Sequence, residues 1–184
     1  MKLPGYVTYT RNRVDKASGG ISTSVIDDDA SNCIRVEEGS DDNEFIVTRH
    51  SKFATPVNII NMYGQQECRM SKESIEKHWN DILEVIGRIE ERDELTVVIG
   101  DLNRHLGSEI PGNSSKVSYG GELVNEFLES GKYVLVNSTE KVKEGPGLGR
   151  IHPTKRTSLC WTSLLYHRNL NNTLNPWKSI TKEQ

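Results

Sequence analysis

The stretch that decides the fold is "ELTVVIGDLNRHLG", residues 94–107. Its apolar run Leu95–Ile99 is rich in β-branched residues and predicts a buried strand that ends at Gly100. Asp101 and Asn103 follow at the carboxyl end of that strand, where ligands bind in α/β sheets. The same residue types also end strands for local reasons, by forming Asx-turns. On this stretch alone, the floor of an active site and a structural turn are both open interpretations.

Upstream of this stretch the sequence predicts a series of short strands. The segments share a high content of Val, Ile, Thr and Tyr, and clusters of Gly, Asp, Asn or Ser separate them. The run "EEGSDDNEF", residues 37–45, has the composition of a hairpin turn. The predicted strands are Gly5–Thr10, Gly20–Ile26, Cys33–Glu37, Glu44–Arg49 and Val57–Tyr63.

A helix is predicted at residues 71–93, after these strands. Its apolar residues recur every three or four positions, which is the period of a helix with one buried face. Ser71 has the side chain of an N-cap, and Glu73 places a carboxylate in the first turn, where it complements the helix dipole. We expect the apolar stripe to lie in the core: Ile75, Trp79, Ile82, Leu83, Ile86 and Ile89.

The alternation of strands and helices continues beyond residue 107. A second helix is predicted at Glu122–Glu129, ended by Gly131, and a further strand at Tyr133–Asn137. Helices between extended apolar strands are typical of a layered α/β domain, in which helices cover a sheet. We expect the early strands of that sheet to form a meander.

Composition sets the class of protein. A chain of 184 residues is long enough for one domain, and its apolar content of 34% predicts a thin core. The three cysteines lack the spacing of a disulfide framework or a zinc site. No apolar run approaches about 18 residues, and residues 1–10 lack the apolar stretch of a signal peptide. We therefore expect an intracellular protein, in the nucleus or cytoplasm, with no membrane contact and no obligate protein partner.

The charge is distributed unevenly. Residues 145–184 hold six Lys and Arg against one acidic residue, whereas the whole chain carries a net charge of −3. A basic tail of this kind is either solvated or in contact with nucleic acid. The change in composition near Gly145 is the first sign of a boundary.

Five motifs, taken in order, carry a resemblance to a known family. Their order and approximate spacing are similar to those of the endonuclease/exonuclease/phosphatase family, and most similar to the apurinic-type endonuclease domains of non-LTR retrotransposons. The resemblance covers most of residues 5–160. The motifs are "GGISTSV" at 19–25, "NIINMYG" at 58–64, "VVIGDLNRHLG" at 97–107, "GGELVNEFLESGKYVLVN" at 120–137 and "TSLC" at 157–160.

The resemblance implies a fold and a chemistry. The fold is a four-layered α/β sandwich of the DNase I type, and the reaction is the Mg²⁺-dependent attack of water on a phosphodiester of DNA. By resemblance, Asp101 orients the water, Asn103 holds the scissile phosphate and Tyr63 contacts the phosphate. Alternatively, Tyr63 is a half-buried aromatic at a strand end. His105 matches no catalytic position, and we expect a surface residue.

Other family features are missing from the sequence. The family's Asn-bearing strand and metal-binding Glu precede its "GYxxY" segment, but here Met1 stands four residues before Gly5. No Ser-Asp-His triplet occurs, so the family's Asp/His pair is also missing. We therefore expect a sandwich that is incomplete at both ends. Asp101 is the one metal ligand to be considered, so Mg²⁺ binding is doubtful.

A shift of reading frame explains the divergent end of the resemblance. The family strand reads approximately Ser-Leu-Asp-Leu-Val-Ile, where this chain has "TSLCWTSLLY" at 157–166. If Cys160–His167 is written TGT TGG ACC TCG TTG TTA TAT CAC, reading from the third base gives Leu-Asp-Leu-Val-Val-Ile-Ser. This hypothesis predicts a partial family domain at 1–157 and an out-of-frame, poorly ordered tail at 158–184.

The function expected from these features is that of a DNA-nicking endonuclease domain with little or no remaining activity. Two alternatives are open. The first is a non-catalytic remnant that binds nucleic acid through Arg104 and the basic tail, and the second is a phosphatase of the same fold that acts on a small phosphoester.

Overall fold

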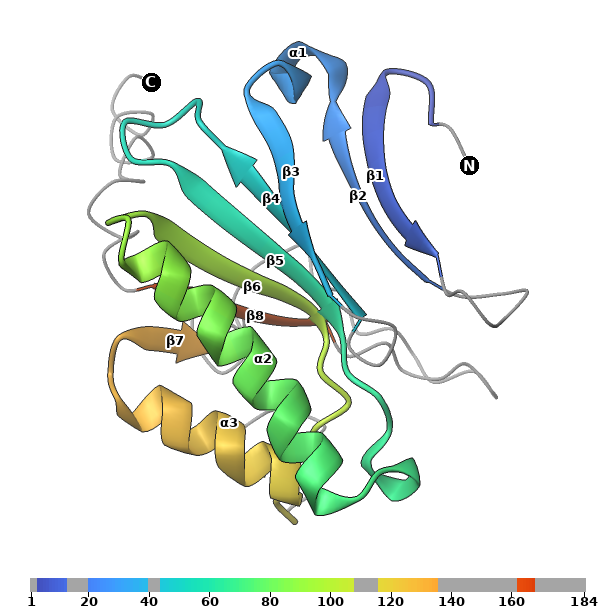
Figure 1. Ribbon diagram of the computed structural model, residues 1–184, viewed down its shortest axis with the longest axis vertical. Helices are drawn as coiled ribbons and strands as arrows, with labels where there is room; N and C mark the ends of the chain where they lie inside the picture. Colours follow the sequence, from blue (N-terminus) through green and yellow to red (C-terminus); the bar gives the residue numbers. More distant parts are fainter. Residues whose placement is uncertain (1–2, 13–19, 40–43, 108–115, 136–161, 168–184) are drawn as a thin grey trace, which may run out of the picture.

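The computed structural model describes residues 3–12, 20–39, 44–107, 116–135 and 162–167, the last of these by backbone alone (Figure 1). Eight strands and four helical segments follow one another in these ranges. The strands are β1 (Tyr6–Asn12), β2 (Gly20–Ile26), β3 (Cys33–Glu38), β4 (Glu44–His50), β5 (Val57–Tyr63), β6 (Leu95–Asp101), β7 (Tyr133–Leu135) and β8 (Thr162–His167). The helices are α1 (Asp27–Ala30), the 3-10 turn η1 (Glu67–Arg69), α2 (Lys72–Glu90) and α3 (Tyr119–Glu129).

A six-stranded sheet forms the centre of the structure, in the order β3-β4-β5-β6-β8-β7. Strands β3, β4 and β5 form an antiparallel meander, as the sequence predicts. Strands β5 and β6 are parallel, with α2 as the crossover between them. Strand β8 lies antiparallel between β6 and β7. The parallel pair brings the carboxyl ends of β5 and β6 to the same edge of the sheet.

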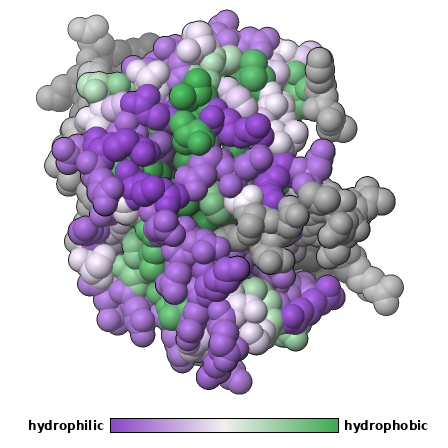
Figure 2. Space-filling model, in the orientation of Figure 1, coloured by the Kyte–Doolittle hydropathy of each residue, from purple (hydrophilic) through white to green (hydrophobic). Residues whose placement is uncertain are grey.

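Both long helices cover one face of this sheet (Figure 1). The stripe predicted for α2 is buried there, apart from Leu83, which is partly buried. Phe127 of α3 packs edge-on against Trp79, with ring centroids 5.7 Å apart, and against Tyr133 at 4.6 Å. Hydrophilic residues cover most of the outer face shown in Figure 2.

The β1–β2 hairpin covers the opposite face of the sheet, at β4 and β5. Asn61 lies between Ile60 and Met62, which face the helices, so its side chain points to the other face. There its Nδ2 donates to the Ser22 carbonyl at 3.0 Å and to the Thr23 hydroxyl at 3.2 Å. Tyr9 of β1 also donates its hydroxyl to the Cys33 carbonyl at 2.8 Å.

The mixed α/β class and the predicted elements are confirmed wherever the structure describes them. The hairpin of β3 and β4 forms, although its turn at residues 40–43 lies outside the described residues. Helix α3 begins three residues before the predicted Glu122, because Ser118 caps it. Over the described ranges, the helices and two sheets form three layers. No helix in these ranges is long and apolar enough to span a membrane.

Two segments differ from the sequence-based expectation. The single-turn helix α1 was not predicted, and β8 lies within the segment that we assigned to a tail. The proposed boundary between residues 157 and 158 and the rest of that tail lie outside the described residues.

Candidate functional site

The three residues singled out by the sequence meet at one edge of the central sheet. Tyr63 ends β5 and Asp101 ends β6, and the two are direct partners in the parallel register. Residues at the same level of neighbouring strands project from the same face, so the Tyr63 and Asp101 side chains lie beside each other. Asn103 follows in the loop and is hydrogen-bonded to Asp101.

Gly100 makes this close approach of β5 and β6 possible. Its φ of 126° lies in a region that L side chains rarely adopt. A Cβ atom at this position would lie 1.9 Å from the Met62 carbonyl oxygen on β5. Any side chain would therefore push the two strands apart just before Asp101.

Asp101 and Asn103 form the Asx-turn that the sequence left open. The Asn103 backbone N–H donates to Asp101 Oδ1 at 3.0 Å, and Asn103 adopts a left-handed φ of 50°. Asn tolerates this conformation better than most residues. The structural interpretation is therefore correct for the backbone, but the turn also fixes where the two side chains lie.

A second set of bonds joins this turn to the loop after β5. Asn103 Nδ2 donates to the Gly64 carbonyl at 2.5 Å, and the Gly64 N–H donates to the Asp101 carbonyl at 2.7 Å. These bonds hold the ends of β5 and β6 as one unit. Gly64 ends the motif at residues 58–64, but this role could not be predicted, because the contact joins two loops that are distant in the chain.

Burial alters the acidity of the Asp101 carboxyl. Desolvation raises its pKa, and the hydrogen bond from the Asn103 N–H opposes that increase. A carboxylate with a raised pKa is a better proton acceptor than an exposed one. This property suits a group that orients or deprotonates water.

The buried side chain of Arg104 joins the loop after β6 to the loop after β5. Its side chain is 8% exposed, and its Nη1 donates to the Gln65 carbonyl at 2.7 Å. Its Nε lies 3.5 Å from Glu67 Oε1, and burial lowers the pKa of the guanidinium. The charged group therefore faces the protein and leaves little surface for the contact with nucleic acid that the sequence-based alternative gives to Arg104.

Glu67 extends this support to the start of α3. It accepts a hydrogen bond from Ser118 Oγ at 2.6 Å. Ser118 Oγ in turn accepts from the Gly121 N–H at 3.2 Å and from the His105 N–H at 3.1 Å. The His105 residue itself is exposed, which confirms the prediction of a surface histidine. A serine before a helical pattern is an N-cap signal that could have identified Ser118.

Glu44 is a further neighbour of the site that the sequence did not identify. It begins β4 and is the antiparallel partner of Tyr63, so one row across the sheet reads Glu44, Tyr63, Asp101. Glu44 is 6% exposed, which is unusual for a glutamate. The row becomes visible only once the register of β4 on β5 is known.

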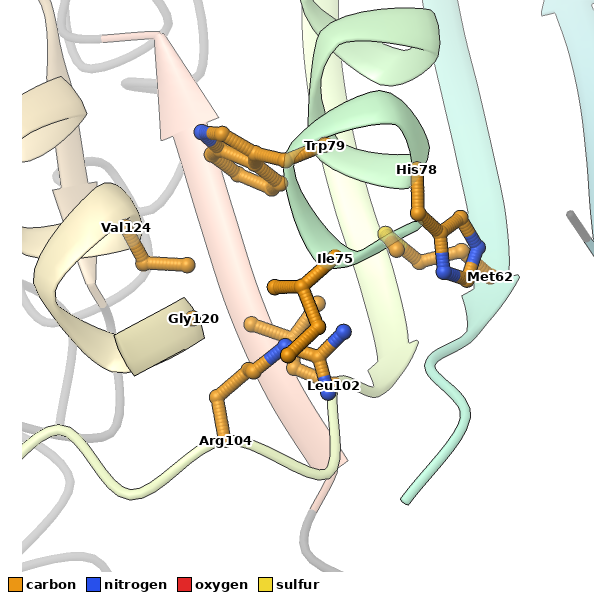
Figure 3. Close-up of a pocket in the computed structure, with 8 residues that line it drawn as sticks. All are labelled: Met62, Ile75, His78, Trp79, Leu102, Arg104, Gly120 and Val124. Carbon is orange, nitrogen blue, oxygen red and sulfur yellow. The ribbon is translucent and has the colours of Figure 1, made fainter. Parts of the chain in front are cut away.

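A small cavity lies next to the site, between the sheet and the two helices (Figure 3). Figure 3 shows the Arg104 side chain turned inward, toward Ile75 and Leu102. The volume of the cavity is about 10 Å³, which is enough for a single water molecule but too small for a substrate. This cavity is therefore no substrate pocket, and a substrate of Tyr63 and Asp101 would bind outside it, at the carboxyl ends of β5 and β6.

The side chains at this edge do not fit Mg²⁺. The ion requires six oxygen ligands in near-ideal octahedral geometry, usually with one or two carboxylates among them. Asp101 offers a carboxylate, but one of its oxygens is bonded to the Asn103 N–H. Among the described residues, no group of three His, Cys, Asp or Glu side chains could hold a metal ion.

The sequence matches no model of a known protein family, and it matches no curated protein.

Proposed function

We propose that this chain is an endonuclease-type domain of the endonuclease/exonuclease/phosphatase class, with a DNA-phosphate site at Tyr63, Asp101 and Asn103 that has little or no hydrolytic turnover. The proposal includes a DNase I-like, four-layered sandwich, and the layered α/β arrangement of the described residues supports it. The observation that carries it is the direct pairing of Tyr63 with Asp101, to which Asn103 is bonded.

Asp101 supplies the group that acts on water. Its Oδ1 is fixed by the Asn103 N–H, so Oδ2 is the atom that would accept a hydrogen bond from a water molecule. The raised pKa of this carboxyl strengthens that interaction.

Asn103 and Tyr63 supply hydrogen-bond donors for a phosphate. The Asn103 amide has two N–H groups, and the Gly64 carbonyl accepts one of them. The second N–H can therefore donate to a phosphate oxygen without any rotation of the side chain. The Tyr63 hydroxyl, on the same face, is suited to a second phosphate oxygen.

Low turnover follows from the weak positive charge at this site. Phosphoryl transfer requires cations that stabilise the charge on the equatorial oxygens. Arg104 follows Asn103 directly in the chain, but its guanidinium is buried against Gln65 and Glu67. The described residues also offer no metal-binding group, so binding should persist where hydrolysis does not.

Two assays on the full chain test this proposal. In the first, supercoiled plasmid is incubated with protein and Mg²⁺, and nicking by the wild type is compared with nicking by Asp101→Ala and by Glu129→Ala, an exposed control on α3. We expect all three proteins to nick at the same background rate. Nicking that is lost only in Asp101→Ala would contradict low turnover.

The second assay measures binding of a fluorescently labelled DNA duplex by anisotropy. Asn103→Asp keeps a side chain that tolerates the left-handed backbone but replaces the amide donor by a carboxylate. We expect binding to weaken by about ten-fold, the value of one hydrogen bond to a charged group. Wild-type affinity that is undetectable, or unchanged in Asn103→Asp, would contradict a phosphate site here.

A further inference from the structure

The outer edge of β1 is a long and open strand edge. Strand β1 pairs with β2 and with no other strand in the described ranges. It stands at the border of the molecule in Figure 1. Tyr6 is 47% exposed and Val7 is 38% exposed. Open edges of this kind pair readily with another chain unless the sequence protects them.

The two edges of the six-stranded sheet, β3 and β7, carry such protection, and β1 does not. Strand β3 has a bulge between Arg35 and Glu37 and ends on two glutamates, and β7 spans three of the described residues. Bulges, charges and short length all oppose edge pairing. Residues 6–10 of β1 read "YVTYT", which is uncharged and high in β-propensity.

The direction of the backbone groups on β1 follows from one hydrogen bond. The Asp27 N–H donates to the Gly5 carbonyl at 3.0 Å, so Gly5 faces β2. Because antiparallel strands alternate, the backbone groups of Tyr6, Thr8 and Thr10 face the outer edge. Consistent with this, Arg35 reaches the Thr10 carbonyl at 3.5 Å.

We propose that β1 pairs antiparallel with β1 of a second copy of this chain, with the two Thr8 residues opposite each other on a two-fold axis. Thr10 then lies opposite Tyr6 of the second copy, and Tyr9 lies opposite Val7. Thr–Thr and aromatic–β-branched pairs are favourable across strands. The single charged residue of β1, Arg11, falls opposite Gly5, so no like charges meet.

The existing hydrogen bonds select this register. The Tyr6 N–H already donates to the Leu3 carbonyl at 3.2 Å, and the Thr10 carbonyl already accepts from Arg35. With Thr8 on the axis, these two occupied groups lie opposite each other. The N–H and carbonyl of Thr8, the Thr10 N–H and the Tyr6 carbonyl then form four bonds across the axis. If the second strand were shifted so that its Thr8 lay opposite Thr10, the Thr8 N–H would face the Thr10 carbonyl, which already accepts from Arg35.

The oligomeric state of the full chain tests this proposal. We expect analytical ultracentrifugation to show a concentration-dependent dimer. Thr8→Lys should weaken that dimer by about ten-fold or more, because it places two like charges opposite each other on an edge. The matched control is Ser24→Lys, since Ser24 of β2 pairs with Thr8 but lies away from the outer edge of β1. A wild-type monomer, or equal weakening by both variants, would overturn the proposal.

Cysteine cross-linking tests the register itself, in a background with Cys68→Ser and Cys160→Ser. The Cα atoms of a hydrogen-bonded antiparallel pair lie about 5.5 Å apart, within reach of a disulfide. Thr8→Cys should therefore give a covalent dimer on oxidation. In Thr10→Cys the two sulfurs would lie four residues apart along the strands, roughly 13 Å, and no dimer should form. This register would be overturned if both variants cross-linked equally or if Thr8→Cys gave no covalent dimer. The two-fold dimer would be overturned if the protein formed open-ended aggregates that Thr8→Lys did not affect.

Discussion

Asp101 has two roles that oppose each other at the scale of a single residue. Its Oδ1 holds the turn by accepting the Asn103 N–H, which stabilises the fold. Its burial beside Tyr63 penalises the charged form and raises its pKa. A group that gains reactivity from burial in this way costs the protein stability once it ionises.

This opposition predicts a dependence of stability on pH. Between the ordinary Asp pKa of 3.8 and the raised value, the folded chain binds more protons than the unfolded chain. The free energy of unfolding therefore loses a contribution as the pH rises through this window. Asp101→Asn keeps an Oδ1 acceptor and removes the charge. We expect the urea midpoint of Asp101→Asn minus that of the wild type to be larger at pH 7 than at pH 3.

Asp28→Asn, at an exposed position on α1, is the control for this measurement. The relative midpoint of that variant should not rise between the two pH values. A relative midpoint of Asp101→Asn that falls with pH would contradict the effect of burial on Asp101.

At the same scale, the sequence predicted which polar residues mark the edge of the sheet, but not what holds them. Tyr63, Asp101 and Asn103 are visible because each follows an apolar strand pattern. Gly64 and Glu67 are not, because each acts through a contact between segments far apart in the sequence. The burial of Arg104 was not predicted for a related reason: a loop arginine is exposed by default, and its burial depends on Glu67.

Among the elements, the two long helices begin in different ways. Ser71 caps α2 by accepting the Ser74 N–H at 3.2 Å. Ser118 caps α3 and also joins Glu67 and His105 to that helix. The start of α3 is therefore part of the support beneath the candidate site, whereas the start of α2 is a local feature.

This difference predicts unequal effects of the same substitution. Ser71→Ala should lower the free energy of unfolding by about 1 kcal/mol, the usual value of an N-cap. Ser118→Ala should cost about 2 to 3 kcal/mol, because the Glu67 carboxylate and the His105 N–H also lose a partner. Urea unfolding of both variants measures the ratio. Equal losses would show that the network around Ser118 adds nothing to the cap.

Element boundaries were predicted well where periodicity is strong and poorly where glycine intervenes. Helix α2 follows its apolar stripe closely, whereas the first turn of α3 contains Gly120 and Gly121, which have low helix propensity. Glycine is needed there because a Cβ at Gly121 would lie 2.1 Å from the His105 carbonyl oxygen. The pairing of β8 was not predicted, since the order of strands in a sheet is not encoded locally.

At the scale of the whole molecule, the two faces of the central sheet are covered by different amounts of structure. Helices and a large apolar cluster protect one face, and on the other face a two-stranded hairpin lies over β4 and β5. A two-stranded hairpin is marginally stable by itself. Its position therefore depends on a few contacts, among them the two hydrogen bonds from Asn61 to β2.

Removal of these two bonds should loosen the hairpin without unfolding the sheet. Asn61→Leu keeps the volume of the side chain and removes both donors. We expect faster amide hydrogen exchange at Gly20–Ile26, by about ten-fold if local opening becomes easier by 1 to 2 kcal/mol. Exchange at Leu95–Asp101 is the internal reference and should not change. Faster exchange in both strands would mean that the hairpin and the sheet open together.

The insertion of β8 between β6 and β7 has a consequence for synthesis on the ribosome. Strand β8, the second neighbour of β6 beside β5, is made only after β7 has emerged, so the new chain holds β6 as an open sheet edge in the meantime. At ordinary rates of translation, this interval lasts on the order of several seconds. During it, β7 lacks the strand with which it pairs, and the backbone N–H and carbonyl groups on the β8 side of β6 are exposed to other nascent chains. The order in which the strands are made, as much as their final arrangement, therefore sets when this sheet is most open to mispairing.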